Sequence, residues 1–232
     1  LWALLGTSVH AIIEKAGTDI VKELRVYKQF NEGLVSGKAD YYDPVAKEII
    51  DFKVTSKYAV QYGKVKPEWE QQLNVLAYLF NELGLQVRKI AILAILRDWA
   101  SKDKLKHEFT DVPFMRLDVS LWSKDRAELF IKERLNAHQY AMTMPISILT
   151  PCSPEERWQS DEVYAIKKNN LMKAAKLCDT LEEAQSYCEA KGYLIGTAAN
   201  FYSITKRPGL GKRCLDYCPV KKYCSHAIEQ GY

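Results

Sequence analysis

Two neighbouring segments of the chain carry acidic residues and a lysine at a spacing that suits metal-ion chemistry. Asp40 ends the segment 37–40 (GKAD), and Asp51 and Lys53 lie in the segment 50–53 (IDFK). Carboxylates are hard ligands of the kind that Mg²⁺ and Mn²⁺ prefer. A lysine beside them adds positive charge where a phosphate would develop negative charge. A plain ion pair between Asp51 and Lys53 is the alternative, and the pattern alone leaves both interpretations open.

A β-hairpin is expected to bring these side chains together. Residues 33–42 and 46–55 are rich in Val, Ile, Phe and Tyr, and an Asp-Pro pair between them is typical of a turn. Such a turn places Asp40 opposite Asp51 to within one residue, and facing residues have Cβ atoms only about 5 Å apart. Lys53 lies two residues after Asp51, so both point to the same face of their strand.

Two residues outside the hairpin have side chains that suit the same site. His10 lies in a segment, 1–16, that is expected to be a helix, and a neutral imidazole is a suitable extra ligand for a divalent cation. Its alternative is a histidine on a helix surface or in a core. Gln72 borders the apolar stripe of an amphipathic helix that begins at Pro67, so it could reach the edge of a site. Its alternative is a solvated glutamine.

Three cysteines near the end of the chain predict a second, softer metal centre. Cys214, Cys218 and Cys224 are spaced C-x3-C-x5-C and could hold one iron–sulfur cluster. Cys152 is the first candidate for the fourth ligand, and His226 is a rival that would favour structural Zn²⁺. The two remaining cysteines are expected to pack in a core: Cys178 and Cys188.

Composition is that of an ordinary globular protein and excludes few functions. The chain has 232 residues, with 33 basic and 29 acidic side chains and a net charge of +4, which permits nucleic-acid binding without requiring it. No apolar run is long enough to cross a membrane and no signal peptide is visible, so no membrane partner is expected. The chain begins at Leu1 rather than Met, which suggests that a preceding segment is missing.

The order of apolar segments predicts an α/β fold with a central mixed sheet flanked by helices. We expect this core to occupy residues 1–150, with prolines at 145, 151 and 154 marking its end. A small α/β insertion is expected over 151–210, and a cysteine-rich tail over 211–232 is expected to dock on the core. The further elements predicted within the core are strands over 20–30, 87–99 and 114–121 and helices over 67–83 and 123–142.

Basic and aromatic residues alternate in the loop that follows the hairpin. Such a loop could track a phosphate backbone and stack a base, and a solvated loop is an equally good interpretation. The residues concerned are Lys53, Lys57, Tyr58, Tyr62, Lys64 and Lys66.

Taken in order, these motifs resemble the PD-(D/E)XK nuclease superfamily. The match is to residues 6–10 (GTSVH), 37–40 and 51–53 and to Gln72 with its helix, within residues 1 to about 100. The chain looks most like the RecB-type branch, which includes nuclease domains of recombination helicase–nucleases and CRISPR-adaptation exonucleases; phage recombination nucleases are similar. The resemblance implies a restriction-endonuclease-like core and a metal-dependent DNA nuclease, expected to be an exonuclease in DNA recombination, repair or phage DNA processing.

The resemblance also implies roles for individual residues. Lys53 would orient or activate the attacking water and stabilise charge on the phosphate, and Gln72 would position Lys53 or the substrate. The branch commonly has a tyrosine four residues after this glutamine, whereas here Leu76 stands there and Tyr78 follows two residues later. The resemblance implies that Mg²⁺ or Mn²⁺ is bound by the side chains of His10, Asp40 and Asp51 and by the backbone carbonyl of Phe52.

Cofactor and partners follow from the same resemblance. Some members bind a [4Fe–4S] cluster through three C-terminal cysteines and one distant cysteine that precedes the core, whereas here the distant candidate, Cys152, follows it. The expected partners are DNA, as single strands or duplex ends, and recombination or helicase proteins. The expected compartment is the cytoplasm of a bacterium or a phage-infected cell. The alternative is a non-catalytic nucleic-acid-binding module with a structural Fe–S or zinc site.

Overall fold

A computed structural model describes residues 2–15, 21–106 and 109–232 of the chain. The chain divides into two compact units, residues 1–142 and residues 143–232, each with a buried core of its own. Among the described residues, no helix has the length and apolar character needed to span a membrane.

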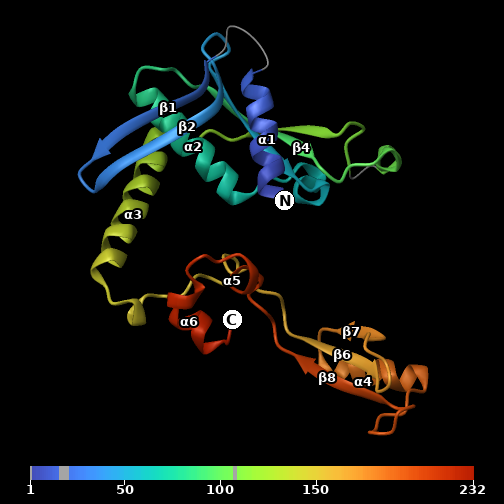
Figure 1. Cartoon of the computed structure of the whole chain (residues 1–232). Coiled ribbons are helices and arrows are strands. Elements are labelled where there is room, and N and C mark those ends of the chain that lie inside the picture. The colour runs from blue at the N-terminus through green and yellow to red at the C-terminus, as the bar shows by residue number, and fades with distance from the viewer. Residues whose placement is uncertain (1, 16–20, 107–108) are drawn as a thin grey trace. The chain divides into compact units, whose positions relative to one another are not determined.

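The first unit is built on a mixed five-stranded sheet in the order β1-β2-β3-β4-β5 (Figure 1). Neighbouring strands run antiparallel except β3 and β4, which run parallel and are connected through a helix. This arrangement confirms the predicted α/β class with a central mixed sheet. The strands are β1 (Val21–Phe30), β2 (Gly33–Asp43), β3 (Glu48–Thr55), β4 (Lys89–Leu96) and β5 (Phe114–Val119).

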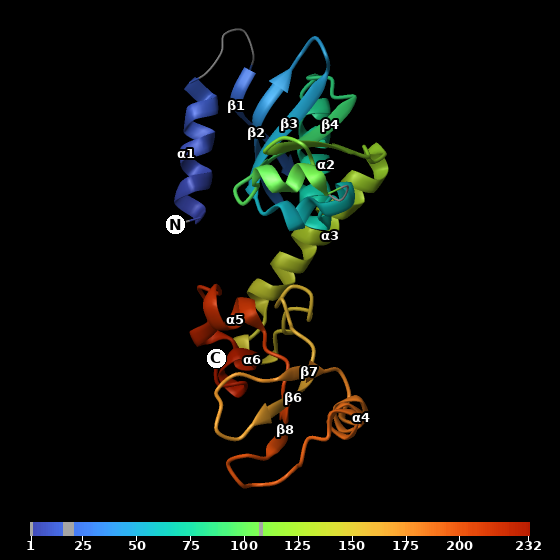
Figure 2. The same cartoon turned by 90° about the vertical axis from the view of Figure 1, so that its right-hand side faces the viewer.

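Helices flank this sheet on both faces. Figure 2 shows α1 (Trp2–Lys15) and α2 (Pro67–Glu82) on opposite sides of the strands. A third helix, α3 (Lys124–Thr143), follows β5, and the hydroxyl of Ser123 caps it by accepting the Arg126 N–H at 3.2 Å. The sequence predicted both the helix and its cap.

The hairpin of β2 and β3 has the predicted register. The Asp43 carboxylate accepts the backbone N–H groups of Val45 and Ala46 at 2.8 and 2.9 Å, which closes the turn. Paired residues then follow in order, the last pair being Tyr41 with Ile50. Only residues 41–43 of β2 pair with β3, so the rest of β2 runs on with β1 as a two-stranded ribbon (Figure 1).

Helix α2 packs its apolar stripe on the sheet because the sequence repeats apolar residues at helical spacing. Leu73, Leu76 and Phe80 are buried, whereas Leu83 is 52% exposed beyond the helix end. The helix approaches β2 closely at Gly37, where an added Cβ would lie 3.2 Å from a methyl group of Leu76. A side chain at this position would require Leu76 to shift by a few tenths of an ångström.

The second unit contains a small antiparallel sheet in the order β7-β6-β8, covered by one helix, α4 (Leu181–Lys191). The Thr180 hydroxyl caps α4 by accepting the Glu183 N–H at 3.1 Å. Strand β7 was not predicted because it has only three residues. The strands are β6 (Val163–Lys168), β7 (Lys176–Cys178) and β8 (Tyr202–Arg207), and the buried core residues are Ile166, Cys178, Ala184 and Cys188.

The cysteine-rich tail belongs to this second unit. It contains α5 (Lys212–Asp216) and α6 (Ser225–Glu229), and the Arg213 N–H donates to the Arg157 carbonyl at 3.0 Å. The chain therefore divides after residue 142, where the sequence placed the boundary at 150, and it groups the tail with the segment that starts at Thr143. Docking of the tail on the first unit stays a prediction.

Candidate active site

The hairpin brings Asp40 beside the segment that carries Asp51. Continued by one residue, the register of β2 and β3 sets Asp40 opposite Asp51, as the sequence predicted. The Asp40 carboxylate accepts the backbone N–H of Phe52 at 2.9 Å, which fixes its orientation. Two carboxylates thus come from neighbouring strands, next to a backbone carbonyl at Phe52.

Asp51, Lys53 and Gln72 form a closed triangle of polar contacts. The Lys53 ammonium lies 2.8 Å from one Asp51 oxygen, and the Gln72 amide nitrogen donates to the other oxygen at 3.1 Å. Lys53 also donates to the Gln72 amide oxygen at 3.0 Å. Asp51 is only 6% exposed, so its charge needs these partners to offset desolvation. The ion pair expected as the alternative is therefore present, and metal binding at this position stays a prediction.

The donor chemistry at this position fits a hard divalent cation. Asp40, Asp51 and the Phe52 carbonyl offer only oxygen atoms, which are the ligands of Mg²⁺ and Mn²⁺. Within the described part of the chain, no three acidic, histidine or cysteine side chains gather closely enough to hold an ion. The side chain of the third predicted ligand, His10, lies outside the described residues, so its role stays a prediction.

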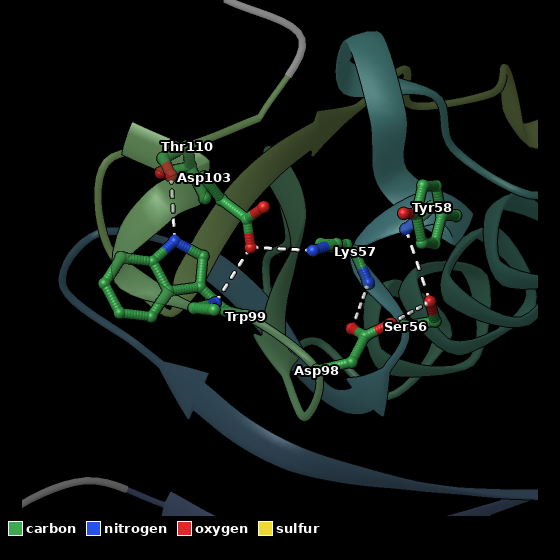
Figure 3. A network of polar contacts seen from close by, with 8 residues as sticks. Ser56, Lys57, Tyr58, Asp98, Trp99, Asp103 and Thr110 are labelled. Atoms are coloured by element: carbon green, nitrogen blue, oxygen red, sulfur yellow. Dashed lines mark hydrogen bonds and ion pairs between the residues drawn. The ribbon is translucent and has the colours of Figure 1, made fainter. Parts of the chain in front are cut away.

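Beyond β3 the chain is fixed by a buried ion pair (Figure 3). The Lys57 ammonium donates to the Asp103 carboxylate at 2.7 Å, and Asp103 is fully buried. The backbone N–H of Lys57 donates to Asp98 at 2.7 Å, and the hydroxyl of Ser56 donates to the same carboxylate at 2.6 Å. Lys57 therefore holds the loop in place, and the expectation that it follows a phosphate backbone is wrong because its charge is already paired inside the protein.

The same contact shifts the pKa values of both partners. The hydrogen bond from Lys57 lowers the pKa of the Asp103 carboxyl, although burial works in the opposite direction. It raises the pKa of the Lys57 ammonium, again against burial. Both groups are thereby held in their charged forms over the neutral range.

The rest of this loop, η1 (Lys57–Gly63) and the residues after it, keeps features that suit nucleic acid. Tyr58 and Tyr62 are 61% and 65% exposed, and Lys64 is exposed. The Lys66 ammonium lies 5.0 Å from the centre of the Trp69 ring, where it makes a cation–π contact. Base stacking or phosphate binding by the loop stays a prediction.

Two residues of α2 clarify how Gln72 is positioned. Asn74 is buried, and its amide oxygen accepts the backbone N–H of Trp122 at 2.7 Å. This hydrogen bond ties α2 to the segment just before α3. Sequence reasoning missed Asn74 because its partner is 48 residues away. Tyr78 does not join the triangle: its ring stacks on Phe30 at 6.2 Å, and burial and nearby glutamates raise its pKa to about 12.

Four cysteines of the second unit lie within electrostatic range of one another. Burial raises the pKa of the Cys214 thiol, and Cys218, Cys152 and Cys224 raise it further, while Arg157 opposes them. Among the described residues, however, no three such side chains are close enough to hold an ion. A metal or iron–sulfur centre with Cys152 as its fourth ligand therefore stays a prediction.

An apolar hollow of about 370 Å³ adjoins these cysteines. Cys152 and Cys224 both line it. The rival ligand, His226, is close to this segment, and its Nε2 atom is buried without a hydrogen-bond partner among the residues that the structure describes. Zinc therefore remains the alternative to a cluster. Residues that also line the hollow are Ile146, Leu149, Pro151, Val220 and Tyr223.

Cys178 and Cys188 lie elsewhere in the second unit. Both are buried in its small core, as predicted, and burial raises the pKa of both thiols. They pack in this core and are not among the groups that shift the pKa of Cys214.

Comparison with known proteins adds little to this geometry. No protein-family model matches the chain, and no curated protein matches it. A solved structure, the crystal structure of SSO0001, is similar with a TM-score of 0.44 and 15% sequence identity, and the match covers 67% of this chain. The match spans 65% of the SSO0001 chain, which is less than two thirds of its length. A likeness at this level carries no argument about activity, so the case for function depends on the site.

Proposed function

We propose that the chain is a metal-dependent deoxyribonuclease of the PD-(D/E)XK type. The observation that carries the proposal is the triangle of the buried Asp51 with Lys53 and Gln72, placed beside Asp40 by the register of one hairpin. A site that only bound nucleic acid would gain nothing from carboxylates facing a phosphate, because like charges repel. A carboxylate pair with a lysine suits phosphodiester hydrolysis.

Each residue of the site has a task that its contacts define. Asp40 and Asp51, with the Phe52 carbonyl, would hold Mg²⁺ or Mn²⁺, which when bound supplies positive charge at the phosphate and a more acidic water. Lys53 brings a hydrogen-bond donor and a positive charge to the side of the scissile phosphate. Gln72 fixes the positions of Lys53 and Asp51 by bonding to both.

The cysteines of the second unit support a structural cofactor in this proposal. A [4Fe–4S] cluster held by Cys152, Cys214, Cys218 and Cys224 would cross-link the tail to the segment after residue 143. Structural Zn²⁺ with His226 is the alternative. Protein purified without oxygen should be brown and contain iron in the first case, and colourless with zinc in the second.

The proposed substrate is DNA, in single strands or at duplex ends. The proposed activity is that of an exonuclease in recombination, repair or phage DNA processing. Recombination or helicase proteins would be partners, and the compartment would be the cytoplasm of a bacterium or infected host.

End-labelled DNA tests the proposal. Wild-type protein should cut it with Mg²⁺ or Mn²⁺ and not with a chelator, and Asp51→Asn should reduce cleavage below detection with an unchanged circular dichroism spectrum. The matched control is Asp118→Asn, which removes an exposed carboxylate of β5. Cleavage by Asp51→Asn at the wild-type rate would overturn the assignment. Binding without any metal-dependent cleavage would favour a non-catalytic binding module.

A further inference from the structure

A groove in the first unit runs from the triangle along the ribbon of β1 and β2. It has a volume of about 430 Å³ and lies where β2 has left β3, with α2 and α3 as its other walls. Gln72, which contacts Asp51 and Lys53, is one of its lining residues. The groove therefore shares Gln72 with the candidate active site.

Positive charge dominates the lining of this groove. Arg25 on β1, Lys38 on β2 and Arg134 on α3 line it, against one acidic residue, Glu68. Arg134 makes no hydrogen bond or ion pair with any residue that the structure describes, and Arg25 is held only by a 3.1 Å hydrogen bond to the Ser36 hydroxyl. Cations gathered in a hollow attract an anionic ligand.

Two of these cations face each other across the ribbon. Arg25 and Lys38 are direct cross-strand partners, so their charges lie side by side in the lining of the groove. Lys38 also lies two residues before Asp40 on β2, so both point to the same face, about 7 Å apart along the strand. A phosphate chain that reaches Asp40 would thus meet Lys38 and Arg25 next.

We propose that this groove binds the single nucleic-acid strand that leads to or from the scissile phosphate. The inference rests on the proposed function and adds the strand's path and its contacts. A volume of about 430 Å³ is that of a small-ligand site, so the groove would hold a short stretch of one strand. Arg25, Lys38 and Arg134 would contact phosphates, so the recognition does not depend on base sequence.

Binding of a fluorescent single-stranded oligonucleotide, measured by anisotropy with a chelator present, tests the groove apart from cleavage. Arg134→Ala should weaken binding several-fold and equally for different base sequences. The slope of log affinity against log salt should become shallower by about 0.7 for each phosphate that the variant no longer neutralises. Arg134→Lys should recover part of the affinity.

In cleavage assays, Arg134→Ala should raise KM more than it lowers kcat. Arg25→Ala should behave in the same way, whereas the matched control Arg88→Ala, an exposed arginine just before β4, should bind as wild type does.

The outcomes separate this inference from the nuclease proposal. If wild-type protein cuts DNA but Arg134→Ala and Arg25→Ala keep wild-type affinity and salt slope, the groove assignment is overturned and the nuclease stands. If the variants weaken duplex binding and leave single-strand binding unchanged, the groove assignment is also overturned. If the variants weaken single-strand binding while no wild-type cleavage occurs, the groove stands and the nuclease proposal fails.

Discussion

The two units of the chain differ in the size of their buried cores. Residues 1–142 bury a large continuous core between a five-stranded sheet and its helices, of which α2 contributes six buried residues. Residues 143–232 bury a core of only four residues, and the tail helices α5 and α6 have five residues each. Small cores are marginal, and proteins supplement them with disulfides or metals. The first unit can therefore devote polar residues to a site, whereas for the second we propose that the cysteines supply structure.

This difference predicts that the polar site and the cysteines respond to mutation in opposite ways. Changes in the triangle should remove chemistry and spare stability, and changes in the cysteines should do the reverse. The largest effects are expected at Lys53 and the cysteines, and the smallest at Gln72.

Lys53→Ala should lower the rate of metal-dependent cleavage by about 10²–10³-fold, because it removes the donor and the charge beside the phosphate. The melting temperature should fall only modestly, because Gln72 still donates to the buried Asp51 carboxylate when the lysine is removed. Gel-based cleavage rates and thermal melts measure the two quantities. Lys64→Ala, in the exposed loop, is the control for loss of one lysine. Equal cleavage by wild type and Lys53→Ala would remove Lys53 from the mechanism.

Cys218→Ser should lower the free energy of unfolding of the second unit by about 3 kcal/mol or more, because the binding energy of a structural metal centre is also folding energy. Cleavage per folded molecule should fall much less. Visible absorption, metal content and thermal melts follow the change. Cys188→Ala is the control, since it lies in the separate small core and should keep colour and iron or zinc. Unchanged thermal stability in Cys218→Ser would contradict a structural role.

Asp103→Asn should lower the melting temperature by several degrees, because it leaves the buried Lys57 ammonium without its counter-charge. The pKa of Asp103 is lowered and that of Lys57 is raised, so the pair contributes fully between the unfolded values of about 4 and about 10.4. Its contribution is lost as pH falls through the folded pKa of Asp103, or rises through that of Lys57. The difference from wild type should therefore be constant between about pH 5 and pH 9 and shrink in stronger acid. Asp111→Asn, which changes an exposed carboxylate, is the control. An equal fall in melting temperature in that variant would show that the Lys57–Asp103 pair does not stabilise the fold.

Gln72→Ala should lower cleavage by about tenfold, as expected for a residue that positions a ligand and a lysine without contacting substrate. The control is Gln86→Ala, whose amide oxygen accepts from the ammonium of Lys47 at the opposite end of the sheet. Because Gln72 orients Lys53, the double variant Gln72→Ala with Lys53→Ala should be little worse than Lys53→Ala alone. A fully additive loss would show that the two residues act independently.

Local features of the structure were predictable from the sequence because local rules determine them. The Asp43 turn fixes the hairpin register, Pro67 opens α2, and Ser123 and Thr180 cap their helices. The site residues Asp40, Asp51 and Lys53 followed from that register.

Features that depend on distant partners were not predictable. Lys57 pairs with a residue 46 positions away, so its sequence context of lysines and tyrosines suggested a solvent-facing role instead. Asn74 and the boundary after residue 142 depend in the same way on tertiary packing. That Arg25 faces Lys38 could have been predicted from the sequence, because the two-residue turn between β1 and β2 sets the register of that hairpin.

Binding of Mn²⁺ tests the central claim most directly, because it does not depend on finding the right substrate. Titration of the wild-type protein, followed by the electron paramagnetic resonance signal of free Mn²⁺, should show saturable binding. The double variant Asp40→Asn with Asp51→Asn should lose it while keeping its circular dichroism spectrum and melting behaviour. If the double variant binds Mn²⁺ as the wild type does, the two carboxylates do not form a metal site and the account is wrong.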